Sequence, residues 1–519
     1  MSAPNILYIM ADDHAANAIS AYDSILADVA PTPNIDRIAE NGLRMNNCEC
    51  VNSICSPSRA NILTGQHCHV NGVRTLSDHL PKEDRLISEI FQENGYQTAL
   101  FGKWHLHAEP RGFDQWITLP GQGLYHDPIF NFRSAEDIPE GGQMSYSEAF
   151  GENEYKFQSY KFGHMGRING YVTDVITDMT LDWLEKRDQE EPFFLCCHHK
   201  APHDFFGYPH RLDDYLKDVE LPEPETLFED EEALKEISRK YGSTMSDRWE
   251  PRNAVKHLQG GTVGEIGEVD FDGLDFKERA RKAYQFYVKE YLRACSGIDE
   301  NVGRILDYLE ETGLAENTLV IYTSDQGMLL GEHDKIDKRW FFEESQQMPF
   351  LAQLPGKIPA GTVSDALVDN TDFAPTLLNL AGLSAPDSMQ GTSFEEVLAN
   401  PELDGKDAVY YRYWMHMAHH WVPSHYGIRT KDYKLIFFYG MKLDAAGCPQ
   451  EGEWSKNTEP GFELYDLVKD PLEKHNVYRD PDYADIAADL KQQLLALKEE
   501  IGDTDENYPE LRSLQKHFF

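Results

Sequence analysis

The sequence predicts an α/β protein: a large, mixed but mostly parallel sheet sandwiched by helices, followed by a smaller part of antiparallel sheet and helix. Two observations predict the larger part. Four short apolar runs are continuous rather than alternating, and helical patterns separate them. A third observation predicts the smaller part, because after Leu383 the pattern changes to hairpin-like runs and one helix. Strands that alternate with helices are typical of a layered α/β sheet.

The four apolar runs are the predicted strands. A short, continuous apolar run is expected where a strand is buried on both faces of a parallel sheet. Their order along the chain, with helical patterns between them, places them in one sheet. The four runs are Asn5–Met10, Thr98–Phe101, Pro192–Cys197 and Thr318–Thr323.

The predicted helices lie between these strands. Ile35–Asn41 follows a Pro-Thr-Pro start, Leu86–Glu93 precedes a glycine, and Val172–Lys186 has apolar residues near helical spacing. Phe276–Leu314 is a long helical region that we expect to break near Ser296-Gly297. Residues 205–276 form an acidic insertion with Gly and Pro, which we expect to be a cap or a long loop rather than core.

The C-terminal part is predicted as a separate unit. Tyr426–Thr430 and Tyr433–Tyr439 flank a two-residue turn and indicate an antiparallel hairpin. A helix is expected between Asp480-Pro481 and Gly502, because four apolar residues recur there at helical spacing. We therefore expect a large domain over residues 1–390 and an antiparallel-sheet subdomain over residues 391–519. The apolar residues of the helix are Ile486, Leu490, Leu494 and Leu497.

The net charge of the chain argues against some classes of binding partner. Against 48 Lys and Arg stand 89 Asp and Glu, a net charge of −41, which argues against nucleic-acid binding and against anionic membrane surfaces. No apolar run could span a bilayer and no signal peptide is visible. As given, the chain is expected to be cytoplasmic, or periplasmic or secreted if a signal was trimmed. Eight cysteines are too sparse for a disulfide scaffold, and the cluster Cys48, Cys50, Cys55 and Cys68 lacks structural zinc spacing.

Charged or imidazole side chains follow all four predicted strands. In open α/β sheets ligands bind at the carboxyl ends of the strands, so these residues are expected to share one site. Adjacent carboxylates repel each other, and a divalent cation relieves that repulsion. Oxygen-only ligands favour a hard cation, calcium or magnesium, over zinc. The oxygen donors at these strand ends are Asp12, Asp13, Asp325 and Gln326.

The stretch Cys55–Gly65 (CSPSRANILTG) carries the most specific pattern. It resembles the C-x-P-S-R…T-G signature of the type I, formylglycine-dependent sulfatases. The resemblance extends along most of the chain through PNILYIMADD, GKWH, HHKAPH, SDQG and YGIRTKDYKLI, and favours bacterial glycan sulfatases of the N-acetylglucosamine-6-sulfatase and iduronate-sulfatase kinds. It implies an alkaline phosphatase-like fold, catalysis by residues 1–390, and a sulfated mono- or oligosaccharide as substrate.

The resemblance also implies the nucleophile and the metal. In this family the cysteine that matches Cys55 is converted to Cα-formylglycine by a maturing enzyme, which is therefore an expected partner. One hydroxyl of the hydrated aldehyde attacks sulfur, and the other expels sulfate by re-forming the aldehyde. Calcium is the implied ion and magnesium the less favoured one. Its matching ligands are Asp12, Asp13, Cys55 through its diol, Asp325 and Gln326, where Gln326 replaces the Asn of many members.

Five further residues match family positions with assigned roles. Arg59 matches the arginine that steadies the formylglycine hydroxyl. Lys103 and Lys338 match the two sulfate-binding lysines. His105 matches the histidine that assists the hydroxyl eliminating sulfate. His203 matches the histidine near the leaving-group oxygen and is the candidate general acid.

Four other histidines lie near these motifs. His107 stands where a small residue is common in the family, so it is expected to reach the substrate. His198, His199 and His333 either contact the substrate or support the site from behind. The segment Tyr413–His425 (YWMHMAHHWVPSH) is either a domain interface or a sugar-facing wall of aromatic rings.

Two other functions compete with the sulfatase hypothesis. A phosphonate or phosphate mono- or diester hydrolase would share the fold, the metal and the nucleophile. A catalytically dead glycan-binding relative is disfavoured, because Cys55, Arg59, Lys103, His203 and Lys338 all occur together. The net charge adds an expectation about substrate size: the acidic shell should repel long, densely sulfated polymers and favour short fragments.

Overall fold

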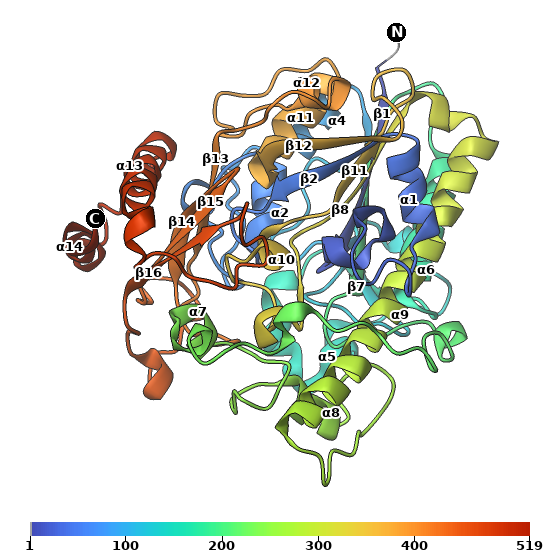
Figure 1. Ribbon diagram of the computed structural model, residues 1–519. Helices are drawn as coiled ribbons and strands as arrows, with labels where there is room; N and C mark the ends of the chain where they lie inside the picture. Colours follow the sequence, from blue (N-terminus) through green and yellow to red (C-terminus); the bar gives the residue numbers. More distant parts are fainter. Residues whose placement is uncertain (1–2) are drawn as a thin grey trace.

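A ten-stranded sheet runs through the centre of the computed structural model, which describes residues 3–519 (Figure 1). The strand order is β12-β2-β11-β8-β1-β7-β3-β4-β5-β6, and five of the nine pairings are parallel. The central strands from β8 to β4 are all parallel, which confirms the predicted mixed, mostly parallel sheet. The strands are β1 Asn5–Asp12, β2 Leu43–Glu49, β3 Gln97–Lys103, β4 Gln115–Leu119, β5 Ile129–Phe132, β6 His164–Arg167, β7 Phe193–Pro202, β8 Thr318–Ser324, β11 Phe350–Gln353 and β12 Thr362–Asp369.

The four predicted strands are β1, β3, β7 and β8, the neighbours at the centre of this sheet. Their continuous apolar runs have the predicted cause. In β1, Ile6 and Tyr8 pack into the hydrophobic cluster on one face of the sheet, whereas Leu7 and Ile9 pack into the cluster on the other face. Because both faces are covered, an alternating pattern would leave polar groups in a core.

Helices cover both faces of the sheet (Figure 1). One face packs against α2, α4, α11 and α12, and the other against α1, α6 and α9. This arrangement confirms the predicted sandwich, and α1, α4, α6 and α9 match the predicted helices. Their bounds are α1 Pro33–Glu40, α2 Cys55–Thr64, α4 Ile87–Glu93, α6 Val172–Lys186, α9 Phe276–Glu311, α11 Phe373–Leu380 and α12 Glu395–Ala399.

The break expected near Ser296-Gly297 is wrong, because α9 runs unbroken for 36 residues. Gly297 serves close packing instead. A Cβ at this position would lie 3.1 Å from Cδ of Pro209 and 3.5 Å from the ring of Tyr171. The glycine therefore lets the insertion and the start of α6 approach the helix, which is a tertiary reason that helix propensity does not contain.

The insertion of residues 205–276 is more compact than the expected long loop. It contains only short helices, but it buries apolar side chains such as Phe206, Met245 and Leu258 in a cluster shared with the N-terminal half of α9. This segment therefore has its own small core. Its short α-helices are α7 Ile237–Lys240 and α8 Ala254–Gln259.

A second, four-stranded antiparallel sheet forms the C-terminal part, at the left of Figure 1. The predicted hairpin is β14 and β15, and the predicted helix is α13, which ends at Gly502 with φ 82°. Leu490 and Leu494 of α13 are buried against the sheet, while Ile486 and Leu497 are partly buried there. The division near residue 391 stays a prediction. The elements are β13 Ala408–Tyr413, β14 His425–Thr430, β15 Tyr433–Phe438, β16 Gly461–Asp466, α13 Ala484–Ile501 and α14 Pro509–Phe518.

Short elements complete the fold. Among residues 3–519, no helix is both long enough and apolar enough to cross a membrane. All eight cysteines are buried and unpaired.

The remaining elements are β9 Leu329–Leu330, β10 Ile336–Asp337, α3 Cys68–Asn71, α5 Tyr146–Phe150 and α10 Glu343–Gln346.

Candidate active site

The carboxyl ends of the central strands bring the predicted site residues together. Asp12 ends β1, Asp325 follows β8 and Lys103 ends β3, while His203 follows β7. Because β1 pairs with β7 on one side and β8 on the other, these residues share one edge of the sheet. Asp13 lies just beyond β1 with a left-handed φ of 71°, a conformation in which strain is often stored at functional sites.

Three carboxylates form the centre of the site. Asp12, Asp13 and Asp325 are fully buried, and each offers one oxygen within 4.8 Å of the others. The backbone N–H of Asp13 donates to Oδ1 of Asp325 at 3.1 Å. Burial and the neighbouring charge of Asp12 raise the pKa of Asp325 to about 7, which is the effect expected when like charges are buried together.

Three cations surround these carboxylates. Arg59 donates to Oδ2 of Asp325 at 2.9 Å, Lys103 pairs with Asp12, and Lys338 pairs with Asp13 at 2.5 Å. Burial by itself would raise the pKa of Asp12, but Lys103 and the other nearby cations hold it well below its ordinary value. The site is therefore close to neutral in a strongly acidic protein, although it is built from six buried charges.

Helix α2 presents Cys55 to this centre. Cys55 is the first residue of the helix, all ten residues of α2 are buried, and Gly65 ends it in a left-handed conformation. Arg59 follows Cys55 by four residues, so both lie on the same face. Sγ of Cys55 lies within 4.8 Å of an Asp12 oxygen and a His203 ring nitrogen, and Gln326 donates to it at 3.7 Å. Burial and the charge of Asp12 raise the pKa of the thiol well above its usual value, so unmodified Cys55 is a poor thiolate nucleophile.

Unpaired oxygen atoms in the cluster fit a hard cation. Oδ1 of Asp12 and Oε1 of Gln326 are buried without a hydrogen-bond donor, which is costly unless another group satisfies them. Asp13 and Asp325 contribute further carboxylate oxygens, so the candidate ligand atoms of these four residues are all oxygen. Such a set suits calcium or magnesium better than zinc.

Two predicted histidines lie beside this cluster. Nε2 of His203 is 3.7 Å from Oδ2 of Asp13, and its Nδ1 is 3.0 Å from Oδ1 of Asp204. His105 is 5% exposed, and its Nδ1 has no hydrogen-bond partner within residues 3–519. Burial and the charge of Lys103 hold the pKa of His105 well below its ordinary value, so His105 is a neutral base that can accept a proton.

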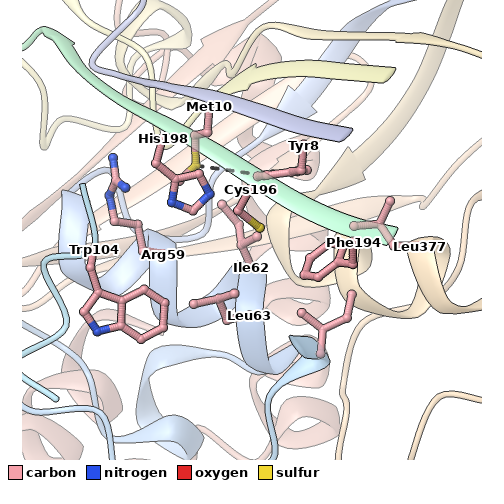
Figure 2. Close-up of a pocket in the computed structure, with 11 residues that line it drawn as sticks. Tyr8, Met10, Arg59, Ile62, Leu63, Trp104, Phe194, Cys196, His198 and Leu377 are labelled. Atoms are coloured by element: carbon pink, nitrogen blue, oxygen red, sulfur yellow. Dashed lines mark hydrogen bonds between the residues drawn. The ribbon is translucent and has the colours of Figure 1, made fainter. Parts of the chain in front are cut away.

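The three histidines with two interpretations all contact other groups of the protein. The carbonyl of Lys103 is 3.1 Å from Nδ1 of His198. Figure 2 shows His198 with Arg59 and Trp104 on the wall of a small enclosed apolar cavity, which is unsuited to a sulfated sugar. Nε2 of His199 is 3.6 Å from Sγ of Cys197, and His333 contacts Glu229 and Arg239. These contacts favour the supporting interpretation.

His107, which was expected to reach the substrate, packs beside the site against other protein groups. Its two ring nitrogens lie 2.7 Å from Oγ of Ser159 and 2.7 Å from the carbonyl of Leu76. The hydroxyl of Tyr160 is 3.0 Å from Nε2 of His107, and the Tyr160 ring stacks on His105 with centroids 6.1 Å apart. His107 therefore fixes a wall of the site through Tyr160.

A group of polar residues lies beside Lys338, and of these only His420 belongs to a segment that the sequence had singled out. Asp337 lies 2.8 Å from Nε of Arg339 and 3.3 Å from Nδ1 of His420, and Arg252 pairs with Asp204 at 2.9 Å. Asp337 and Arg339 directly flank Lys338 in the sequence, so their position in the DKRW run was the available signal. Arg252 comes from the insertion, for which no such signal existed.

Different residues of the segment Tyr413–His425 fit its two interpretations, the domain interface and the sugar-facing wall. Trp414, His416 and His425 are buried in the protein, as a domain interface requires. His420 contacts Asp337, and Trp421 is partly exposed with its ring 6.4 Å from that of Trp454. The backbone is left-handed at Met417, His419 and Trp421, and His420 between them contacts the polar group beside Lys338.

Comparison with known proteins supports these observations. A family model described as Sulfatase matches residues 4–383, and one described as N-sulphoglucosamine sulphohydrolase, C-terminal, matches residues 331–447. The chain is 36% identical to an N-acetylglucosamine-6-O-sulfatase of Bacteroides thetaiotaomicron, over 97% of this chain and 87% of the relative. It is 26% identical to an arylsulfatase of Clostridium perfringens, over 99% and 98% of the two chains.

Solved structures share the architecture. One of them, a complex with its substrate D-glucosamine-2-N,6-O-disulfate, superposes with a TM-score of 0.81 at 34% identity, over 98% of this chain and 100% of that chain. A phosphonate monoester hydrolase of Agrobacterium radiobacter superposes with a TM-score of 0.67 at 21% identity, over 96% of each chain. The second likeness shows the fold alone.

Proposed function

The chain belongs to the sulfatase family and hydrolyses sulfate esters, and from this premise we propose that its substrate is a glucosamine carrying a 6-O-sulfate. The proposal on substrate rests on the relative that is 36% identical over nearly the whole chain and on the glucosamine disulfate bound in the superposed structure. One observation of this chain supports the chemistry. Three carboxylates and three cations converge on Cys55 at the carboxyl edge of the sheet.

Asp12, Asp13, Asp325 and Gln326 hold the metal ion in this proposal, together with residue 55. We favour calcium over magnesium, because calcium accepts a larger and less regular set of oxygen ligands. When bound, the ion polarises the sulfate oxygens and favours an ionised nucleophile. The unpaired oxygens of Asp12 and Gln326 support this assignment.

Cys55 is the proposed precursor of formylglycine, made by a maturing enzyme. The hydrate of that group supplies a hydroxyl that attacks sulfur and a second hydroxyl that allows sulfate to leave. The raised pKa of the Cys55 thiol supports the proposal, since a buried, protonated thiol is a weak nucleophile at neutral pH.

In this proposal the buried cations bind the sulfate group and stabilise the negative charge that develops on it during the reaction. Lys103 and Lys338 are the proposed sulfate-binding residues, each of which already faces a carboxylate of the site. Arg59 orients the Cys55 side chain from one helical turn away and is itself fixed by Asp325 and by the carbonyl of Lys103 at 2.9 Å. Because these groups are preorganised, little reorganisation is needed as the oxyanion charge moves.

His203 and His105 are the proposed proton donor and proton acceptor of the reaction. His203 is the proposed general acid, which donates a proton to the sugar oxygen as the ester bond breaks; Asp204 orients its ring through Nδ1. His105 is the proposed base for the hydroxyl that eliminates sulfate, and its lowered pKa keeps it neutral and ready for that role. Asp337, Arg339 and His420 lie beside Lys338 and are the proposed contacts for sugar hydroxyls.

The test is desulfation of a defined substrate panel by protein co-produced with a maturing enzyme. We expect release of sulfate from glucosamine 6-O-sulfates, and a mass loss of about 18 Da on the peptide containing Cys55, as thiol-to-aldehyde conversion requires. An unmodified thiol in active protein would refute the nucleophile. Faster hydrolysis of a phosphonate monoester than of any sulfated sugar would favour the alternative of a phosphonate or phosphate ester hydrolase.

A further inference from the structure

Lys200 differs from the other buried lysines. Six lysines are buried within residues 3–519, and five of them have an oxygen partner in the protein. Lys200 is 4% exposed as a residue, and its Nζ has no hydrogen bond or ion pair to any described residue, although this atom keeps some contact with solvent. An ammonium group that loses most of its hydration without gaining a partner is costly. The five partnered lysines are Lys103, Lys335, Lys338, Lys434 and Lys498.

The surroundings of Lys200 place it at the active site. Nζ lies 4.1 Å from the centroid of the Tyr125 ring, a contact that partly offsets the lost hydration. The Tyr125 hydroxyl donates to the carbonyl of His203, which links this wall to the proposed general acid.

The nearby carboxylates are already engaged. Asp12 pairs with Lys103, Asp13 pairs with Lys338, and Asp204 pairs with Arg252. Burial and the charge of Lys103 lower the pKa of Lys200 to about 8, so most of the population is still protonated at neutral pH. Lys200 is thus a cation without a counter-ion in a site that takes anionic ligands.

We infer that Lys200 binds a second sulfate group of the substrate, carried by the same sugar as the ester that is hydrolysed. The inference rests on the proposed function and deepens it. Lys103 and Lys338 already hold the scissile sulfate in that proposal, whereas Lys200 shares a wall with His203, on the side of the departing sugar. A second sulfate on that sugar would satisfy the ammonium, and the enzyme would then prefer disulfated to monosulfated glucosamine.

The test compares two substrates in matured enzyme with calcium: glucosamine 2-N,6-O-disulfate and N-acetylglucosamine 6-O-sulfate. For Lys200→Met, kcat/KM for the disulfate should fall by roughly 10- to 100-fold, the range of one charge-assisted hydrogen bond. The value for the N-acetyl substrate should change by less than about threefold in comparison. Lys200→Arg should restore most of the preference, and Lys82→Met, at an exposed lysine, should change neither value.

Binding of glucosamine 2-N-sulfate, measured by calorimetry on wild type and Lys200→Met, gives a readout independent of turnover. We expect weaker binding in the variant. Equal losses of kcat/KM for both substrates, or unchanged binding in the variant, would overturn the inference. If wild type hydrolyses neither substrate, the proposed function fails; the calorimetry then decides on Lys200 alone, and no binding to wild type overturns that inference too.

Discussion

Two buried clusters of carboxylates and cations differ in how completely their oxygen atoms are paired. The first is the active-site cluster of Asp12, Asp13, Asp325, Arg59, Lys103 and Lys338. The second, the C-terminal cluster, lies between the antiparallel sheet and α13 and consists of Arg412, Lys498, Asp503 and Asp505. In both, burial of ionised groups is balanced by opposite charges.

In the C-terminal cluster every carboxylate oxygen has a partner. Arg412 contacts both oxygens of Asp503 and one of Asp505 at 2.7 Å, and Lys498 contacts the other oxygen of Asp505 at 2.9 Å. The Arg412 guanidinium also lies 3.6 Å from the centroid of the Trp414 ring. In the active-site cluster, by contrast, Oδ1 of Asp12 and Oε1 of Gln326 have no donor. Pairing of every carboxylate oxygen indicates a structural role, although Nε and Nη2 of Arg412 have no partner, whereas unpaired oxygen atoms that could serve as ligands indicate a site for a cation.

The largest expected effect is a loss of activity when Cys55, beside the active-site cluster, is replaced. Cys55→Ala should lower kcat by on the order of 10⁴-fold or more, because it removes the nucleophile. Its melting temperature should stay within a few degrees of wild type, measured by calorimetry. Cys448→Ala, at another buried cysteine, should keep full activity per folded molecule. Retained activity in Cys55→Ala would move the nucleophile elsewhere.

The second-largest effect should follow removal of the metal ion, which we expect to affect the active-site cluster and not the C-terminal cluster. Dialysis against a chelator should abolish most sulfate release, and calcium should restore it more fully than magnesium. Calcium should also raise the melting temperature of wild type, since a ligand that binds only the folded state stabilises it. Asp325→Asn should lose this rise, whereas Arg412→Met should keep it. A calcium-dependent rise in Asp325→Asn would count against the assigned ligands.

Breaking the C-terminal cluster should instead cost stability. Arg412→Met leaves Asp503 and Asp505 buried without their main partner, which we expect to lower the free energy of unfolding by about 3–5 kcal/mol. Denaturant unfolding measures this loss. The kcat of the folded fraction should stay within about twofold of wild type, because surface and core changes remote from a site act mainly on stability. A large drop in kcat without a loss of stability would contradict the purely structural role that we assign to the C-terminal cluster.

The smallest effect should appear in the pH dependence of stability. Burial opposes ionisation of Asp503, but Arg412 and Lys498 hold the pKa of its carboxyl well below the ordinary value. Because the folded pKa is depressed, Asp503 stabilises the fold above its unfolded pKa of about 3.9 and loses that contribution as the pH falls below it. The free energy of unfolding should therefore fall more steeply between about pH 5 and pH 3 in wild type than in Arg412→Met. Equal slopes would show that this cluster does not contribute.

The sequence predicted the central strands and most helices, because both depend on local apolar patterns. The four continuous runs became four neighbouring strands, and the helix before Gly502 ended where the glycine allows a left-handed residue. The break at Gly297 was predicted wrongly, since the reason for that glycine is Pro209, a contact distant in sequence.

The candidate site followed from the sequence only where residues lie within one motif. Asp12-Asp13 and Asp325-Gln326 sit at strand ends, so their types and position indicated a metal site. Cys55 and Arg59 share one helix turn, and their roles were implied by the resemblance to the sulfatase signature. Arg252 carried no such signal, because it reaches the polar group beside Lys338 from the insertion. His420 lies in the segment Tyr413–His425, for which the sequence left two interpretations open.

By itself, the sequence determined the layered fold, the sulfatase signature and an acidic chain of net charge −41. Only the tertiary structure decided which charges remain available to a ligand. Lys200, in β7, and Lys338, just after β10, are both buried lysines, yet Lys338 pairs with Asp13 and Lys200 has no carboxylate left to pair with. The physical reason is that pairing depends on distances between side chains, and residues 325 positions apart in the chain meet only when β1 lies between β7 and β8.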